Sequence, residues 1–326
     1  MTQTIPDTMQ AAAIDWFGGI ETITLQTLPV PKVGPDEVLI RVEVAGVGSW
    51  DREEREGQYA EYLGEPAFPY VLGWDGAGTI ATVGERVSRF KEGDRVYAAS
   101  FPKQNGGGFY AQYATMEADY VSHVPDELTL EQAGVMGWDV MTALSGVDDV
   151  LDLRPGEALM VFGASGGIGH MAVQLAKRMG ARVLAVASGD DGVALAWRLG
   201  ADAVADGRKD DVVAAARGFA PAGLDAGLVL AGGETADRAL GAVRDGGRIA
   251  YPNGVMPKPK ARPGVHLSSF DAIRGQETTA KLHRLIASGP FEIHVARTFP
   301  LEQVAEAHRA LEQHYLGKLA LRPNGR

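Results

Sequence analysis

The first third of the chain carries short apolar segments separated by turn residues. Residues 38–44 alternate imperfectly between apolar and polar side chains, which is typical of a half-buried strand. Further strands are expected at residues 79–83, at 90–97 after a turn at 92–94, and at 109–114 after a glycine-rich loop at 106–108. Short strands punctuated by glycine predict a small β-barrel or sandwich.

The pattern changes near residue 128, where strands begin to alternate with helices. Thr129 and Gln132 have the spacing of a capping box at a helix start. Residues 158–162 form a continuous apolar run, as expected of a parallel strand covered on both faces. The alternation continues to about residue 251. It predicts right-handed crossovers and an α/β fold with a doubly wound, parallel Rossmann-type sheet.

The chain of 326 residues is too long for a single hydrophobic core, so we expect two domains. Four prolines in residues 252–263 predict a domain exit. Two amphipathic helices and a short final strand are expected beyond it, at residues 278–288, 301–313 and 319–321. We therefore predict a Rossmann-type domain over residues 128–263.

Composition excludes several classes of function. The chain has no cysteine, which excludes disulfides, thiol nucleophiles and cysteine-bound metals. The formal net charge of −11 argues against binding to nucleic acid or to an anionic membrane. Neither a secretory signal at the N-terminus nor an apolar run of about 18 residues is found. These features predict a cytoplasmic protein without a membrane span.

A glycine-rich loop lies between a predicted strand and a predicted helix, the context that a dinucleotide-binding fingerprint requires. Gly166 would let the backbone approach a pyrophosphate, and Gly169 would let the helix pack closely on the strand. Ala164 replaces one glycine of the usual motif. The residues expected to bind the cofactor here are Gly163, Ala164, Ser165, Gly166, Gly167, Ile168 and Gly169.

The same loop also contains the G-x-S-x-G pattern of the nucleophile elbow of α/β-hydrolases. Ser165 would then be a nucleophile that needs an acid and a histidine downstream. Histidines do lie downstream, for example at residues 266, 283, 294, 308 and 314. This alternative leaves Gly169 and the next strand–helix–strand unit unexplained, so the cofactor site is favoured.

The end of the second predicted strand, residues 182–187, bears on the choice of cofactor. An acid at this position bonds the ribose hydroxyls of NAD, whereas this chain has Ser188. Ser188 and Arg208 could bind a 2′-phosphate, while Asp190 and Asp191 would repel it. The balance favours NADP(H) over NAD(H).

Six short motifs occur in the order seen in one enzyme superfamily, at residues 46–51, 72–78, 93–96, 107–113, 246–249 and 317–319. With the glycine-rich loop, they make the chain resemble the medium-chain dehydrogenase/reductase superfamily, and within it the zinc-independent quinone oxidoreductase branch. The resemblance implies a GroES-like β-barrel domain, made of residues 1–127 and 264–326, with a Rossmann domain inserted over residues 128–263. It also implies a small-molecule substrate, an active site between the domains and a homodimer or homotetramer.

Zinc ligands of the metal-dependent relatives are missing. The resemblance places Gly48, Trp74 and Trp138 at or near ligand positions. Asp75 and Asp51 alone fall short of the three protein ligands of a catalytic zinc site. Without zinc, the hydride acceptor must delocalise its own charge, as a quinone or an α,β-unsaturated carbonyl does. Another small carbonyl substrate, or a protein that binds NADPH without catalysis, remains an alternative.

The resemblance also assigns further candidate residues. Those proposed for the acceptor site are Trp50, Asp51, Tyr59, Trp74 and Trp138. Each aromatic residue could equally serve packing, and Asp51 could be a structural hydrogen-bond acceptor. Thr142 and Asn253 are expected beside the nicotinamide. Lys318 could reach the adenosine phosphate or be a solvated surface lysine.

Overall fold

The computed structural model describes residues 4–64, 66–99, 108–273 and 275–324. The chain divides into two compact units, the first made of Met1–Trp138 and Val295–Arg326, and the second of Asp139–His294. The predicted loop at 106–108 lies mostly outside the described residues. Among the described residues, no helix is long and apolar enough to cross a membrane.

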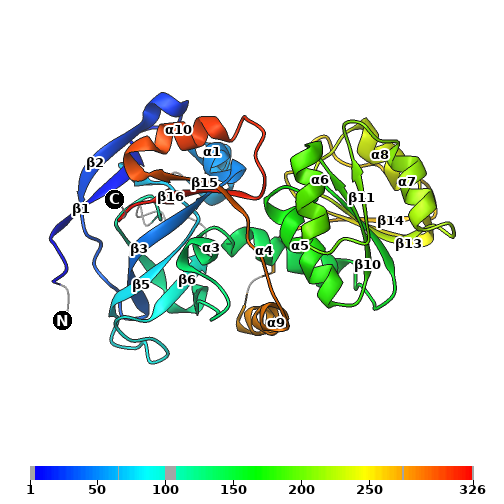
Figure 1. Ribbon diagram of the computed structural model, residues 1–326. Helices are drawn as coiled ribbons and strands as arrows, with labels where there is room; N and C mark the ends of the chain where they lie inside the picture. The colour runs from blue at the N-terminus through cyan, green and yellow to red at the C-terminus, as the bar shows by residue number, and fades with distance from the viewer. Residues whose placement is uncertain (1–3, 65, 100–107, 274, 325–326) are drawn as a thin grey trace. The chain divides into compact units, whose positions relative to one another are not determined.

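The first unit is built around one long strand, β3 (Glu37–Val47), which pairs antiparallel with three others (Figure 1). Its larger sheet has the order β15-β16-β3-β5-β6-β8, with β7 also paired to β3. The other strands of this sheet are β5 (Asp75–Val83), β6 (Arg95–Ala99), β7 (Tyr113–Glu117), β8 (Val121–His123), β15 (Val295–Pro300) and β16 (Lys318–Arg322). A smaller sheet has the order β2-β1-β4, formed by β1 (Thr8–Ile14), β2 (Ile23–Pro29) and β4 (Tyr70–Val71).

The described residues of this unit also form the short helices α1 (Ser49–Arg55), α2 (Ala60–Leu63), α3 (Leu130–Gly134) and α10 (Val304–Ala310). The predicted capping box of α3 is confirmed, since the Gln132 amide donates to Thr129 Oγ1 at 3.2 Å and the Thr129 amide donates to Gln132 Oε1 at 3.0 Å. The helix predicted over residues 301–313 is shorter, because Leu301–Gln303 form a 3-10 turn before α10.

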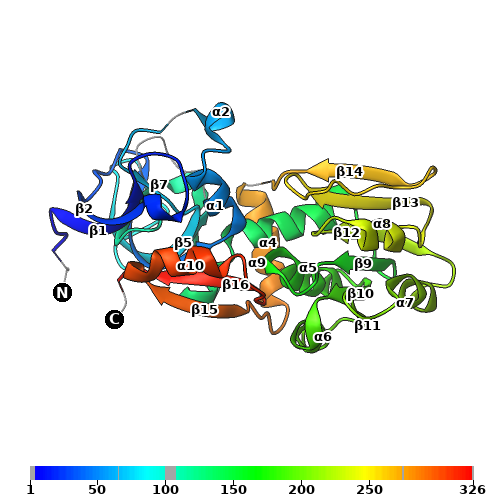
Figure 2. The same ribbon diagram turned by 90° about the horizontal axis from the view of Figure 1, so that it is seen from above.

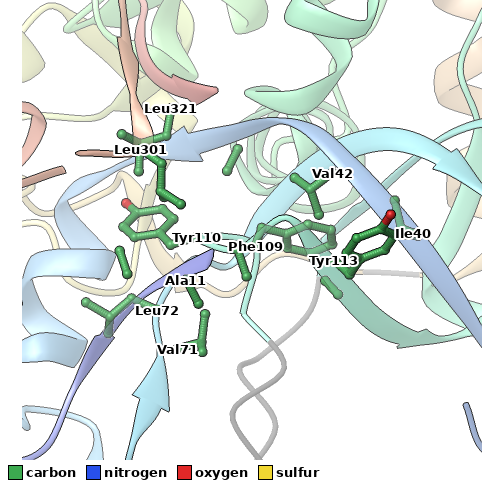
Figure 3. Close-up of a cluster of buried hydrophobic side chains, with 14 of the residues drawn as sticks. Ala11, Ile40, Val42, Val71, Leu72, Phe109, Tyr110, Tyr113, Leu301 and Leu321 are labelled. Carbon is green, nitrogen blue, oxygen red and sulfur yellow. The ribbon is translucent and has the colours of Figure 1, made fainter. Parts of the chain in front are cut away.

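The core of the first unit combines residues from distant parts of the chain (Figure 3). Ala11, Ile40 and Leu72 lie in it with Leu321 from the last strand. The strand predicted at 109–114 begins only at Tyr113. The preceding residues run through the core, where the amides of Phe109 and Tyr110 donate to the carbonyl oxygens of Gly73 and Leu72 at 3.0 and 2.9 Å. These bonds satisfy the buried backbone without a regular ladder.

The second unit contains six parallel strands in the order β11-β10-β9-β12-β13-β14 (Figure 2). They are β9 (Ala158–Phe162), β10 (Arg182–Ala187), β11 (Ala203–Asp206), β12 (Leu224–Val229), β13 (Val243–Pro252) and β14 (His266–Phe270). The order is the 3-2-1-4-5-6 arrangement of the Rossmann fold. The predicted apolar strand at 158–162 is confirmed, and its neighbours cover it on both edges.

Helices cover this sheet on both faces, as a doubly wound fold requires. The helices of this part of the chain are α4 (Gly137–Leu144), a π-helical turn at Ser145–Val150, α5 (Gly167–Arg178), α6 (Gly189–Arg198), α7 (Val212–Phe219), α8 (Glu234–Leu240) and α9 (Gln276–Ala287). Helices α5 and α6 contact each other, and so do α7 and α8. Met160 and Leu184 pack in one cluster with residues of α7 and α8.

The division into units differs from the predicted boundaries at 127/128 and 263/264. Helix α3 packs against β3, β5 and β6 and therefore belongs to the first unit. Strand β14 pairs with β13 in parallel, so the chain beyond the proline-rich segment extends the Rossmann sheet. The proline-rich segment thus lies inside the second unit, which ends at His294.

Candidate functional site

The glycine-rich loop follows β9, the strand at which the order of the Rossmann sheet reverses. Gly163 has a φ of +92°, a left-handed conformation that favours glycine. The amides of Gly163 and Ala164 both donate to the carbonyl oxygen of Val186, at 3.0 and 2.9 Å. The loop is therefore fastened to the end of β10, at the edge where ligands bind to open α/β sheets.

Two glycines of this loop have different surroundings. A Cβ built on Gly169 would lie 2.1 Å from the carbonyl oxygen of Gly163, so helix α5 can pack here only with glycine. A Cβ built on Gly166 would meet only that oxygen, at 3.5 Å. Gly166 is the N-cap of α5 and leaves open space at the N-terminus of a twelve-residue helix. Its unpaired amides and dipole suit a pyrophosphate.

Ser165 lies in the same loop but faces the protein interior. It is 6% exposed, and its Oγ accepts a hydrogen bond from the Ser188 amide at 3.4 Å. A Cβ on Gly192 would lie 3.0 Å from this Oγ, so α6 packs against the serine. A nucleophile elbow exposes its serine at the top of the sheet. The burial of Ser165, together with the Rossmann strand order, speaks against the hydrolase alternative.

The ends of β10 and β11 lie together. The Gly207 amide donates to the Ala187 carbonyl at 2.8 Å, which places Arg208 beside Ser188. Asp206 Oδ1 accepts from the amides of Gly189 and Arg208, at 3.1 and 2.9 Å, and so ties the two turns together. The Arg208 side chain is exposed. The arrangement brings a hydroxyl and a cation to one place at the carboxyl edge of the sheet.

Lys209 is a candidate that the sequence interpretation missed. Its Nζ lies 2.6 Å from Asp190 Oδ1 and 3.8 Å from Asp206 Oδ2. Asp190 was expected to repel a phosphate, but its charge is compensated by this lysine. The signal in the sequence was the pair Arg208–Lys209 directly after the third strand of the unit.

The two residues expected beside the nicotinamide lie on different elements of the second unit. Asn253 follows β13, is exposed, and donates through its amide nitrogen Nδ2 to Asp271 Oδ2 at 2.9 Å. Its backbone amide donates to the Phe270 carbonyl at 2.8 Å. Thr142 is buried on α4. Asn253 thus shares the carboxyl edge of the sheet with the glycine-rich loop.

In the first unit, four aromatic residues predicted for the acceptor site form one cluster. The ring centroids of Trp74 lie 6.5 Å from Trp50, 5.3 Å from Tyr59 and 5.5 Å from Trp138. Trp74 precedes β5, while the other three come from α1, the turn before α2, and α4. Tertiary packing therefore gathers four rings that are up to 88 residues apart in the chain.

Asp51 is fully buried in the same unit. Its Oδ2 accepts a hydrogen bond from the Gly48 amide at 2.7 Å and so caps α1. Burial raises the pKa of Asp51 to about 7, the nearby Asp75 adds to the rise, and the Gly48 amide and Lys318 oppose it. Asp51 is therefore a structural hydrogen-bond acceptor at the start of α1, one of the two roles considered for it from the sequence.

Glu54 is a second buried acid, and the sequence interpretation missed it. Its carboxylate accepts from Tyr70 Oη at 2.5 Å and from Trp74 Nε1 at 2.7 Å, which fixes the central ring of the aromatic cluster. Burial raises the pKa of Glu54 to about 8. On a short, polar helix nothing in the sequence pattern separates this glutamate from the other charged residues around it.

Lys318 is buried and belongs to the first unit. It is 3% exposed, and its Nζ lies 4.8 Å from the centroid of the Trp50 ring. The expectation that it could be a solvated surface lysine is wrong, because β16 carries it into the interior next to β3.

The chain is similar to known proteins over most of its length. Residues 34–126 match the family model of the alcohol dehydrogenase GroES-like domain, and residues 199–321 match that of the zinc-binding dehydrogenases. The quinone oxidoreductase of Mus musculus is 31% identical over 92% of this chain and 93% of its own length. The chain belongs to the medium-chain dehydrogenase/reductase superfamily. Because relatives named quinone oxidoreductase align with nearly the whole chain, it is an oxidoreductase of the quinone oxidoreductase branch of this superfamily.

Solved structures of the superfamily agree with the fold. A mycobacterial protein in complex with NADPH is 28% identical, with a TM-score of 0.82 over 97% of this chain and all of that one. An alcohol dehydrogenase superfamily protein from Novosphingobium aromaticivorans is 27% identical, with a TM-score of 0.85 over 97% of this chain and 99% of that one. The predicted GroES-like and Rossmann architecture is confirmed.

The residues at the superfamily's metal positions do not fit a catalytic zinc. Gly48 has no side chain, and the Trp74 indole nitrogen is a donor that is already bonded to Glu54. In the part of the chain that the structure describes, no group of three histidine or carboxylate side chains could hold a metal ion. One of the two matching family models is named for zinc binding, but Gly48 and Trp74 do not provide donors for such a site at the positions that the structure describes.

We expect the purified protein to contain no stoichiometric zinc and to keep its reductase activity in EDTA. Elemental analysis and activity before and after chelation measure this directly. One tightly bound zinc per chain, or activity lost to EDTA and restored by zinc, would show that the metal positions have been misassigned.

Proposed function

We propose that this protein is an NADPH-dependent reductase that transfers hydride to a quinone or an α,β-unsaturated carbonyl without a catalytic metal. The observation that carries the proposal is the aromatic cluster of Trp50, Tyr59, Trp74 and Trp138, which occupies the region of the superfamily's metal positions. Flat aromatic walls suit a flat, conjugated acceptor. The relatives named quinone oxidoreductase support the same substrate class.

The second unit has groups that suit NADPH, and bound NADPH would supply the hydride. The loop from Gly163 to Gly169 would hold the pyrophosphate on the N-terminus of α5. Ser188, Arg208 and Lys209 would bind the 2′-phosphate. Thr142 and Asn253 remain candidates for the nicotinamide. A mycobacterial structural neighbour was solved with NADPH, which supports this choice of cofactor.

The absence of zinc donors argues for a delocalised acceptor over a simple alcohol. An alcohol must lose its proton as it is oxidised, and a metal assists that step by lowering the pKa of the hydroxyl. A quinone or enone spreads the incoming charge over its own conjugated system. Catalysis then rests mainly on positioning the acceptor.

We also propose that the protein is a homodimer or homotetramer, which light scattering tests.

We expect kcat/KM to be about ten- to a hundredfold higher with NADPH than with NADH, or roughly 1.4 to 3 kcal/mol. Steady-state rates with both cofactors against a quinone, an enone and a secondary alcohol measure this. The variants Arg208→Ala and Lys209→Ala should each erode the preference, whereas Arg217→Ala, an exposed residue on α7, should not.

Three results would count against the proposal. A clear NADH preference overturns the choice of cofactor, and fast metal-free oxidation of the alcohol overturns the substrate class. Tight NADPH binding without turnover of any acceptor favours the remaining alternative, a cofactor-binding protein without catalysis.

A further inference from the structure

Lys318 occupies an unusual position for a lysine, a residue that is rarely buried. It begins β16, whose antiparallel pairing with β3 joins Leu319 to Val47. Continued by one residue, this register brings Lys318 opposite Gly48. The lysine therefore lies where β3 ends and α1 begins.

Trp50 folds back over the same glycine. A Cβ built on Gly48 would lie 2.8 Å from Cε2 and 3.1 Å from Nε1 of the Trp50 indole. The Lys318 ammonium lies 4.8 Å from the centroid of this ring, within the range of a cation–π contact. Gly48 thus makes room for the indole, and the indole holds the ammonium.

The surroundings of the ammonium contain polar atoms that the protein does not satisfy. Asp51 lies close enough for Lys318 to lower the pKa of its carboxyl, against the larger effect of burial. Asp51 Oδ1 and Trp50 Nε1 are buried and have no hydrogen-bond partner among the described residues. Buried polar atoms without partners mark a place for a water molecule or a polar group of a ligand.

We propose that Lys318 is a catalytic residue that binds the carbonyl oxygen of the acceptor and stabilises the negative charge that develops there. This inference rests on the proposed function. A preorganised cation in a site with little water stabilises such a charge far more than it would in bulk solvent. The rings beside it would hold the conjugated plane of the acceptor. Lys318 would thus act on the acceptor, and not on the adenosine phosphate considered from the sequence.

The reaction balances with an enone as acceptor. Hydride from the reduced nicotinamide forms a C–H bond at the β-carbon, and the C=C π bond breaks. Its electron pair moves into the conjugated system and leaves negative charge on the carbonyl oxygen, next to the ammonium. A proton from water then completes the saturated ketone. The nicotinamide is oxidised and the enone is reduced by two electrons.

The variants Lys318→Met and Lys318→Arg test this role against Lys91→Met, a matched control at an exposed lysine of the same unit. With an enone and NADPH, Lys318→Met should lower kcat by about a hundredfold or more. Lys318→Arg keeps the charge and should recover part of the loss. The dissociation constant of NADPH, measured by fluorescence titration, should stay within about twofold of the parent value.

A probe that needs neither cofactor nor turnover is 4-nitrophenol, whose phenolate resembles an acceptor oxygen carrying negative charge. Bound to the parent protein, it should ionise at lower pH than in water, with the phenolate-to-phenol ratio raised about tenfold. Absorbance shows the phenolate directly. Lys318→Met should abolish this rise, and Lys91→Met should leave it unchanged.

Should Lys318→Met fail to fold, Gly48→Ala provides a second test, since it keeps the lysine but displaces the indole that holds it. It should lower kcat and the phenolate ratio together. Unchanged kcat and phenolate ratio in a folded Lys318→Met variant would overturn the inference. A tenfold rise in the NADPH dissociation constant with kcat retained would instead assign Lys318 to the cofactor. Inactivity of the parent with every acceptor, with the phenolate shift intact, would overturn only the proposed function.

Discussion

Gly166→Val should raise the dissociation constant of NADPH at least tenfold, which is about 1.4 kcal/mol, while the protein stays folded. The open space at Gly166 explains both why the variant should stay folded and why it should bind NADPH more weakly. A Cβ added here would meet only the Gly163 carbonyl oxygen, at 3.5 Å. It would, however, fill the space into which the pyrophosphate must enter at the N-terminus of α5. Fluorescence titration and thermal unfolding measure the two quantities.

Two neighbouring variants serve as controls for Gly166→Val. Gly169→Ala should destabilise the fold itself, because its Cβ would lie 2.1 Å from the Gly163 carbonyl oxygen. Ser165→Ala should keep most of the activity, since the hydroxyl only accepts a hydrogen bond from Ser188. Normal NADPH affinity in a folded Gly166→Val variant would refute the cofactor site. Complete loss of activity in Ser165→Ala, with esterase activity in the parent, would revive the hydrolase alternative.

The free energy of unfolding should fall as the pH rises from 6.5 to 8, by about 2 kcal/mol from Glu54 alone. Burial raises the pKa of Glu54 to about 8, from an ordinary value of 4.5. At pH 6.5 the folded carboxyl keeps its proton and at pH 8 about half of the molecules have lost it, whereas the unfolded carboxyl is ionised throughout this range. The stabilisation from the protonated Glu54 carboxyl is therefore fully present below the pKa of this group in the unfolded chain. It is lost as the pH rises through the pKa of the group in the folded protein. Asp51, with its pKa raised to about 7, adds in the same direction.

His308 sets the lower limit of this pH window. Its burial and the nearby Arg55 and Arg52 lower the pKa of the imidazole to about 3, from 6.5. The histidine therefore contributes stability above pH 6.5 that is lost as the pH falls toward 3, which opposes the effect of the acids. Above pH 6.5 the contribution of His308 changes little, so the effect of the two acids is clearest there.

Urea unfolding at pH 6.5 and at pH 8 measures the effect, with Glu54→Gln as the test. The glutamine should reduce the loss of stability between the two pH values, because it cannot ionise. It can still accept from Trp74, while the Tyr70 hydroxyl turns to accept from its amide. Glu85→Gln, at an exposed glutamate, should leave the pH dependence as it is. An equally steep loss in Glu54→Gln would show that this carboxyl is ionised in the folded protein.

Local sequence signals determined much of the fold. The Thr129–Gln132 capping box and the apolar strand at 158–162 depend on contacts within a few residues, and each is found in the structure. The glycine-rich loop was recognisable for the same reason, because the demands on Gly163 and Gly169 arise from the turn itself. The family resemblance supplied the GroES-like architecture that the strand pattern left open.

Only the tertiary structure decided which polar residues are buried. Glu54 and Lys318 look like ordinary surface residues in the sequence, yet one fixes Trp74 and the other stacks on Trp50. The sequence also did not predict where the second unit ends, because β14 pairs with β13 across the proline-rich segment. Burial, pairing and the resulting pKa values depend on contacts between residues far apart in the chain. Local sequence patterns do not predict such contacts, because these residues come together only when the whole chain folds.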